Sequence, residues 1–103
     1  MGYFSDSYME HTRKHVLRTI HAVEAQVGAE WHRGEINEKA VKGDTLALTV
    51  TFPTLDSMTC TITASRIIDI RGEVAAYQQR KINKASGQGT MIKITIPLRE
   101  VSA

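Results

Sequence analysis

Two stretches in which apolar and polar residues alternate constrain the fold of this chain most strongly. The first spans residues 45–52 and places its largest apolar side chains on one face: Leu46, Leu48, Val50 and Phe52. The second spans residues 58–64 and repeats the pattern, with threonines between the apolar members: Met58, Cys60, Ile62 and Ala64. A period of two over this length predicts half-buried antiparallel strands. Between them, Pro53, Asp56 and Ser57 are residue types that favour a chain reversal.

The length and composition indicate a single globular domain. The chain has 103 residues, of which 42% are hydrophobic and 23% are charged, so it can form one core of ordinary size. We expect one domain over residues 1–103, with flexible ends at 1–6 and 99–103. A single cysteine, Cys60, excludes an internal disulfide and favours a reducing compartment.

The sequence has no feature of a secreted or membrane protein. The N-terminus lacks the basic and then apolar run of a signal peptide, and no apolar stretch approaches the length of a membrane span. Gly2 begins a pattern that is similar to a myristoylation signal, but Asp6 stands where serine or threonine is required. These features predict a cytoplasmic protein without a membrane partner.

An amphipathic pattern predicts a helix over residues 7–27. Ser7 and Glu10 have the spacing of an N-terminal capping box, and Ser5 is an alternative cap. Apolar residues then recur at helical intervals, interrupted by one arginine: Met9, Val16, Ile20, Val23 and Val27. Such a stripe is typical of a helix with one buried face. Gly28 follows directly, at a position where helices often end in a left-handed residue.

The region from residue 58 to residue 84 predicts a long strand followed by a second helix. The alternation continues as far as Ile70, with a bend near 65–66 where the pattern breaks. Residues 73–84 are rich in alanine, glutamine, glutamate, arginine and lysine, which favour a helix. The alternative for this segment is a long hairpin strand that turns at 86–89.

The last clear element is a strand over residues 90–96, followed by Pro97, which marks a strand end or a sheet edge. Residues 29–43 carry no pattern that fixes an element. We therefore predict an α+β fold, in which the N-terminal helix packs on an antiparallel or mixed sheet of three to four strands. The predicted core consists of ten apolar residues: Val16, Ile20, Val23, Leu46, Leu48, Val50, Ile62, Ile92, Ile94 and Ile96. In layout alone, this order of elements resembles several small α+β modules, including some that bind RNA.

The candidates for catalysis or metal binding are weak. His11 and His15 have the spacing of two metal ligands on a helix, but Thr12 stands where the zinc-protease pattern requires glutamate. Both histidines lie opposite the apolar stripe, so we interpret them as solvent-facing. Cys60 shares a strand face with apolar residues and is interpreted as a buried structural thiol. With no hydrolase, phosphate-loop or dinucleotide motif present, we expect a protein that is not an enzyme and has no catalytic residue, metal or cofactor.

The segment 86–89, Ser-Gly-Gln-Gly, has the composition of a loop that could hold a phosphate through backbone amides. Two glycines so close together are also ordinary turn chemistry, and the turn is the interpretation we adopt.

The distribution of charge suggests where a partner would bind. The net charge is only +2, but residues 11–21 and 74–98 contain basic and titratable residues without any acid. If the two segments meet, they form a basic binding surface: His11, Lys14, His15, Arg18, Arg80, Lys81 and Lys84. The threonine faces of the strands are flat, uncharged and suited to packing by another subunit.

We therefore expect a small non-catalytic subunit for protein–protein interaction or assembly. Its partner would be another protein or a second copy, giving a homo-oligomer. The alternative is a nucleic-acid-binding module that uses the basic helix face and the cluster at 80–84.

Overall fold

The computed structural model describes residues 4–98. These residues form one α-helix, one 3-10 helix and seven strands: α1 (Asp6–Thr19), β1 (Ile20–Val27), β2 (Glu30–Arg33), β3 (Glu35–Lys42), β4 (Thr45–Thr51), η1 (Pro53–Leu55), β5 (Cys60–Asp69), β6 (Val74–Lys84) and β7 (Met91–Pro97). The flexible ends that the sequence predicts lie in part outside the described residues.

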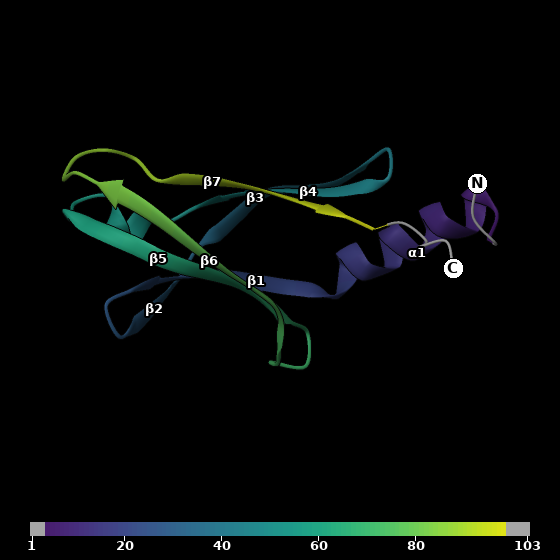
Figure 1. Cartoon of the computed structure of the whole chain (residues 1–103), viewed down its shortest axis with the longest axis horizontal. Helices are drawn as coiled ribbons and strands as arrows, with labels where there is room; N and C mark the ends of the chain where they lie inside the picture. Colours follow the sequence, from purple (N-terminus) through teal and green to yellow (C-terminus); the bar gives the residue numbers. More distant parts are fainter. Residues whose placement is uncertain (1–3, 99–103) are drawn as a thin grey trace.

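The strands form two antiparallel sheets that pack face to face (Figure 1). One sheet has the strand order β2-β1-β5-β6 and the other has the order β3-β4-β7. Apolar side chains from both sheets form the core: Ile20, Val23, Ala25, Leu48, Val50, Phe52, Leu55, Ile62, Ile67 and Ile92. The fold is thus α+β, as predicted, but it contains more strands than the three to four that we expected.

The chain passes from one sheet to the other at Gly34, between β2 and β3. The backbone N–H of Gly34 donates to the carbonyl oxygen of Val23 at 2.9 Å. A Cβ atom at Gly34 would lie 2.6 Å from Cγ1 of Val50 and 2.7 Å from Cε1 of Phe52. Because glycine has no Cβ, it allows the crossing segment to lie this close to the core.

The predicted N-terminal helix is too long. In the structure, α1 begins at Asp6, with Ser5 rather than Ser7 as its N-cap, and ends at Thr19. Residues 20–27 form β1, which pairs with β2 and β5. The spacing of the apolar residues resembles that of a helix because a β-bulge lies between Ile20 and Ala22. The bulge shifts the register, so residues three apart, such as Ile20 and Val23, are both buried in the same strand. Pairing on both edges outweighs helix propensity here.

The helix reaches beyond the end of both sheets, and none of its residues is fully buried (Figure 1). Two cations attach it to the rest of the fold. Nζ of Lys39 donates to the carbonyl oxygens of Leu17 at 3.4 Å and Ile20 at 3.3 Å, where the helix ends. Nε of Arg13 donates to the carbonyl oxygen of Leu98 at 2.6 Å. This hydrogen bond accounts for the arginine within the apolar stripe, because Arg13 binds the residue that directly follows β7.

The predicted second helix at 73–84 is wrong. This segment is β6, the strand of the hairpin that follows β5, and its first eight side chains are exposed. Its residue types favour a helix in isolation. In the fold, however, β6 satisfies the backbone groups along one side of β5, whose other side pairs with β1. The alternative interpretation is confirmed in that the segment is a strand. The hairpin that it forms is with β5, however, and the chain at 86–89 crosses to the other sheet, so β6 and β7 do not pair.

The remaining strand predictions agree with the structure. The even residues of β4 are buried, as the alternation predicted, and β7 lies at a sheet edge, as Pro97 indicated. The pairing of β5 with β6 shifts register twice, between Ile62 and Ala64 and between Ile67 and Ile68, on either side of the bend expected near 65–66. Of the predicted core, three residues are only half-buried: Val16, Ile94 and Ile96.

Candidate functional site

The structure separates the two groups of predicted basic residues. The side chains on α1 are exposed: His11, Lys14, His15 and Arg18. Arg80 and Lys81 are exposed on β6. The part of β6 that approaches the helix is Ala76, which lines a small cavity together with Val16. Arg80 lies four residues further along the strand, or about 13 Å, so the two groups do not form one surface.

Lys84, the last member of the predicted basic surface, is buried, with 5% of its surface exposed. Its Nζ donates three hydrogen bonds, to the carbonyl oxygens of Asp56 at 3.1 Å, Met58 at 2.9 Å and Ala85 at 3.1 Å. The charge of Lys84 is therefore used inside the protein, where it holds two connecting segments together.

The turn at 86–89 also uses its polar groups internally. The N–H of Ser86 donates to Oγ1 of Thr59 at 3.0 Å, and that of Gly87 donates to the carbonyl oxygen of Asp56 at 2.9 Å. The N–H of Gln88 donates to the carbonyl oxygen of Ala85 at 3.2 Å. Because these amides are engaged, the segment matches the turn interpretation rather than a phosphate cradle.

The other chemical candidates are isolated in the fold. Cys60 is half-buried at the start of β5, and His11 and His15 are exposed. Within residues 4–98, no group of three or more histidine, cysteine, aspartate or glutamate side chains could hold a metal ion. The same part of the chain has no helix that is long and apolar enough to cross a membrane.

The structure assembles a cluster that the sequence did not reveal, on the outer face of the four-stranded sheet. The strand register places Arg33, Glu24, Arg66 and Tyr77 in one row across β2, β1, β5 and β6. Oε1 of Glu24 accepts hydrogen bonds from Arg66 at 2.8 Å, and its Oε2 lies 3.3 Å from the guanidinium of Arg33. The Glu24 side chain is only 12% exposed, so one half-buried carboxylate fixes two arginines.

Two aromatic rings complete this group, which we call the aromatic–arginine cluster (Glu24, Trp31, Arg33, Arg66 and Tyr77). The guanidinium of Arg66 lies over the ring of Trp31, 4.0 Å from its centroid. The rings of Trp31 and Tyr77 meet edge to face, with 6.3 Å between centroids. Tyr77 remains 55% exposed. The cluster thus holds a guanidinium against one aromatic ring, beside a second ring that is exposed to the solvent.

Sequence reasoning missed this cluster because its members come from four strands. Trp31 and Arg33 lie in a segment without a clear pattern, and Tyr77 lies in the segment that we expected to be helical. The residue types alone would have been a signal, because tryptophan, tyrosine and arginine are enriched at binding surfaces. Their proximity depends on the register, which the sequence does not give.

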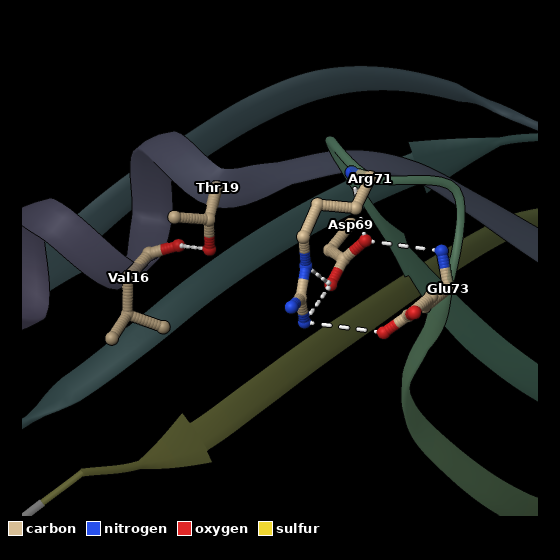
Figure 2. A network of polar contacts seen from close by, with 5 residues as sticks. All are labelled: Val16, Thr19, Asp69, Arg71 and Glu73. Carbon is tan, nitrogen blue, oxygen red and sulfur yellow. Dashed lines mark hydrogen bonds and ion pairs between the residues drawn. The ribbon is translucent and has the colours of Figure 1, made fainter.

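A second polar network closes the turn between β5 and β6 (Figure 2). Oδ1 of Asp69 accepts hydrogen bonds from the backbone N–H of Arg71 at 2.9 Å and of Glu73 at 3.0 Å. Oδ2 of Asp69 lies 3.0 Å from the guanidinium of Arg71, which also contacts Glu73 at 3.3 Å. The carbonyl oxygen of Thr19 accepts from the N–H of Ile70 at 3.0 Å. This turn therefore joins the end of the helix to the four-stranded sheet.

The carboxyl of Asp69 has a pKa below its ordinary value of 3.8. The main cause is the hydrogen bond from the N–H of Glu73, and the contacts with Arg71 act in the same direction, against the effect of burial. Hydrogen bonds to a carboxylate favour its charged form. Asp69 is thus a structural carboxylate, although its partner Arg71 is 73% exposed.

We expect Asp69→Asn to lower the thermal midpoint at neutral pH, because asparagine cannot form the ion pair with Arg71. Since the pKa of Asp69 is lower in the folded than in the unfolded chain, its stabilisation is complete above the unfolded-state value. It is lost as the pH falls through the folded-state value. The difference in midpoint between the two proteins, measured by calorimetry, should therefore shrink below about pH 4. Glu73→Gln, which changes only an exposed carboxylate, should have a smaller effect, and a difference that does not vary with pH would contradict this account.

No family model matches this chain, and searches of curated proteins and of solved structures found no match.

Proposed function

We propose that this chain is a small non-catalytic subunit for protein–protein interaction or assembly, and that the aromatic–arginine cluster is its main contact surface. The observation that carries this proposal is the contact of Arg66 with Trp31, beside the exposed ring of Tyr77. Tryptophan, tyrosine and arginine are the residue types that most often dominate the binding energy of protein interfaces.

Preorganisation supports the same function. Arg66 is held from one side by Glu24 and from the other by Trp31. Binding would therefore cost less side-chain entropy than for a free arginine. The hairpin that carries Tyr77 also exposes Ile70 to 66% and Val74 to 51%. Exposed aliphatic side chains beside such a cluster are suited to a protein partner.

Nucleic-acid binding is the second candidate, because bases stack on aromatic rings and on guanidinium planes. Trp31, Arg66 and Tyr77 offer both kinds of surface, and α1 adds exposed cations. Against this candidate, Glu24 offsets part of the local positive charge, and Lys84 is buried. A protein partner therefore accounts for more of the surface than a polyanion does.

Association of the purified chain tests the proposal. We expect sedimentation velocity to give a mass above one chain as the concentration rises, and Tyr77→Ser to weaken this association at least about tenfold, as for a hot-spot residue. Tyr8→Ser is the matched control, because Tyr8 is exposed to 53% on the helix, away from the cluster. It should leave association unchanged.

If the chain is monomeric at all concentrations, affinity capture from its source cells replaces self-association as the assay. A protein retained by the wild type and by Tyr8→Ser, but lost with Tyr77→Ser, supports an interaction with another protein. Equal retention by all three variants contradicts the proposed surface. Labelled RNA and DNA are titrated in parallel at several salt concentrations, and binding that Tyr77→Ser abolishes would favour the second candidate.

A further inference from the structure

Along one long side of the sandwich, each sheet ends in a strand that has one unpaired edge. β6 is the edge strand of the four-stranded sheet and β7 is the edge strand of the three-stranded sheet. The two strands run along the same side of the molecule (Figure 1), and residues of both line one groove. An edge strand carries N–H and C=O groups that can pair with a further strand.

The walls of this groove, which we call the β6–β7 groove, are mainly apolar. Its volume is about 350 Å³, and it is bordered by Ile67, Ala76 and Tyr77 on one side and by Ile94 and Ile96 on the other. Ile94 and Ile96 belong to the apolar face of β7 but are only half-buried. An added strand would cover them.

The groove continues toward the helix as a smaller apolar cavity of about 150 Å³. The two cavities share Ile67, Ala76 and Ile96, and Val16 and Leu98 line the far end. The apolar surface therefore follows the first half of β6, from Ala75 to Gln78, and suits an extended segment better than a compact ligand.

The charges on the two edge strands indicate which kind of extended segment could bind there. Residues 74–98, which form β6, β7 and their connection, contain no aspartate or glutamate. Their exposed cations are Arg80, Lys81 and Lys93, while the charge of Lys84 is buried. One acidic residue, Asp69, lines the smaller cavity near the helix, but its carboxylate forms an ion pair with Arg71. Like charges on facing strands are destabilising, which disfavours edge-to-edge pairing of β6 or β7 with its own copy.

We propose that β6 accepts an extended segment of an acidic partner protein as an additional strand. Apolar side chains of this segment would enter the β6–β7 groove, and acidic ones would face the exposed cations of β6, Arg80 and Lys81. Of the two edges, β6 is the longer, with 11 residues, whereas β7 ends in Pro97, which lacks a donor. Strand addition of this kind combines main-chain hydrogen bonds with pockets for alternate side chains.

The proposal rests on the proposed function in that the partner is a protein, but it adds the edge of β6 to the contact surface and specifies the partner's chemistry. The test uses capped peptides of about nine residues, a length that nearly spans β6 at about 3.3 Å per residue. In these peptides, glutamate alternates with valine, leucine or tyrosine. The control peptides have lysine in place of glutamate.

Titration followed by NMR should perturb amide signals in β6 and β7 and slow the hydrogen exchange of β6 amides. We expect the lysine peptides to bind at least about tenfold more weakly, and binding of the acidic peptides to weaken with salt. Arg80→Gln with Lys81→Gln should weaken binding severalfold. The matched control, Lys14→Gln with Arg18→Gln, removes two exposed charges from the helix and should leave binding unchanged.

Three results would overturn the inference: no binding of any acidic peptide, equal binding of the lysine peptides, or perturbations confined to β2 and β3. Protection of β6 amides in the chain alone, rising with its concentration, would identify a second copy as the occupant instead. Because Tyr77 borders both the groove and the cluster, the charge variants separate the two failures. Arg80→Gln with Lys81→Gln should weaken peptide binding and leave association through the cluster unchanged.

Discussion

Gly34→Ala is expected to lower the free energy of unfolding by about 1–3 kcal/mol, the usual cost of forcing extra volume into a packed core. The added methyl group would lie 2.6 Å from Cγ1 of Val50, 2.7 Å from Cε1 of Phe52 and 2.9 Å from the carbonyl oxygen of Thr51. Val50 and Phe52 are fully buried. Neither the side chains nor the backbone can move away without displacing other core residues.

The measurement is denaturation by urea or heat, and Gly89→Ala is the matched control. A Cβ at Gly89 would have no atom within 4 Å, and its φ is not in the left-handed region. Gly89→Ala should therefore be neutral within about 0.5 kcal/mol. Equal stability of the two variants would mean that the crossing between β2 and β3 is looser than the packing indicates.

The strands with the clearest alternation were predictable because each buries one face and pairs with neighbours that do the same. In β4, Leu46, Leu48 and Val50 are buried by the opposite sheet. In β7, Ile92 is buried, and Pro97 marks the end of an edge strand. For such strands the period of the sequence and the geometry of the fold agree.

The errors fall where local preference and tertiary pairing differ. Residues 20–27 have apolar spacings that fit a helix, and 73–84 have helix-forming composition, yet both segments pair with β5 as strands. A helix prediction evaluates each segment alone. The decisive interactions are pairings with β5, across 35–49 residues for β1 and 6–24 residues for β6, and a single sequence does not reveal such pairing.

The candidate site was less predictable than the fold. The basic residues of α1 and β6 could be identified as charges, but their separation follows from the helix reaching beyond the sheets. The cluster around Arg66 requires the register of four strands. Lys84 is the sharpest case, because its sequence context, near Arg80 and Lys81, suggests a solvent-exposed lysine.

Lys84→Met should be the most destabilising of the proposed substitutions, lowering the free energy of unfolding by about 2–4 kcal/mol. Methionine keeps the length of the side chain but removes the donors for three carbonyl oxygens, of Asp56, Met58 and Ala85. The carbonyl oxygens of Met58 and Ala85 would lose this donor, whereas that of Asp56 would keep the N–H of Gly87. Leaving a polar group without a partner costs more than the net gain from forming the bond. The affected carbonyls join the connection before β5 to the one after β6, so the ends of both sheets should loosen.

Lys81→Met is the control for Lys84→Met, since Lys81 is exposed on the same strand and loses the same charge. We expect it to change stability by no more than about 0.5 kcal/mol. Hydrogen exchange would locate the effect, because Lys84→Met should speed the exchange of the Ser86 and Gly87 amides, which bond to Thr59 and Asp56 across the same junction. If both lysine variants were equally stable and exchanged alike, Lys84 would be a surface lysine, and the basic cluster at 80–84 would regain its place as a candidate binding surface.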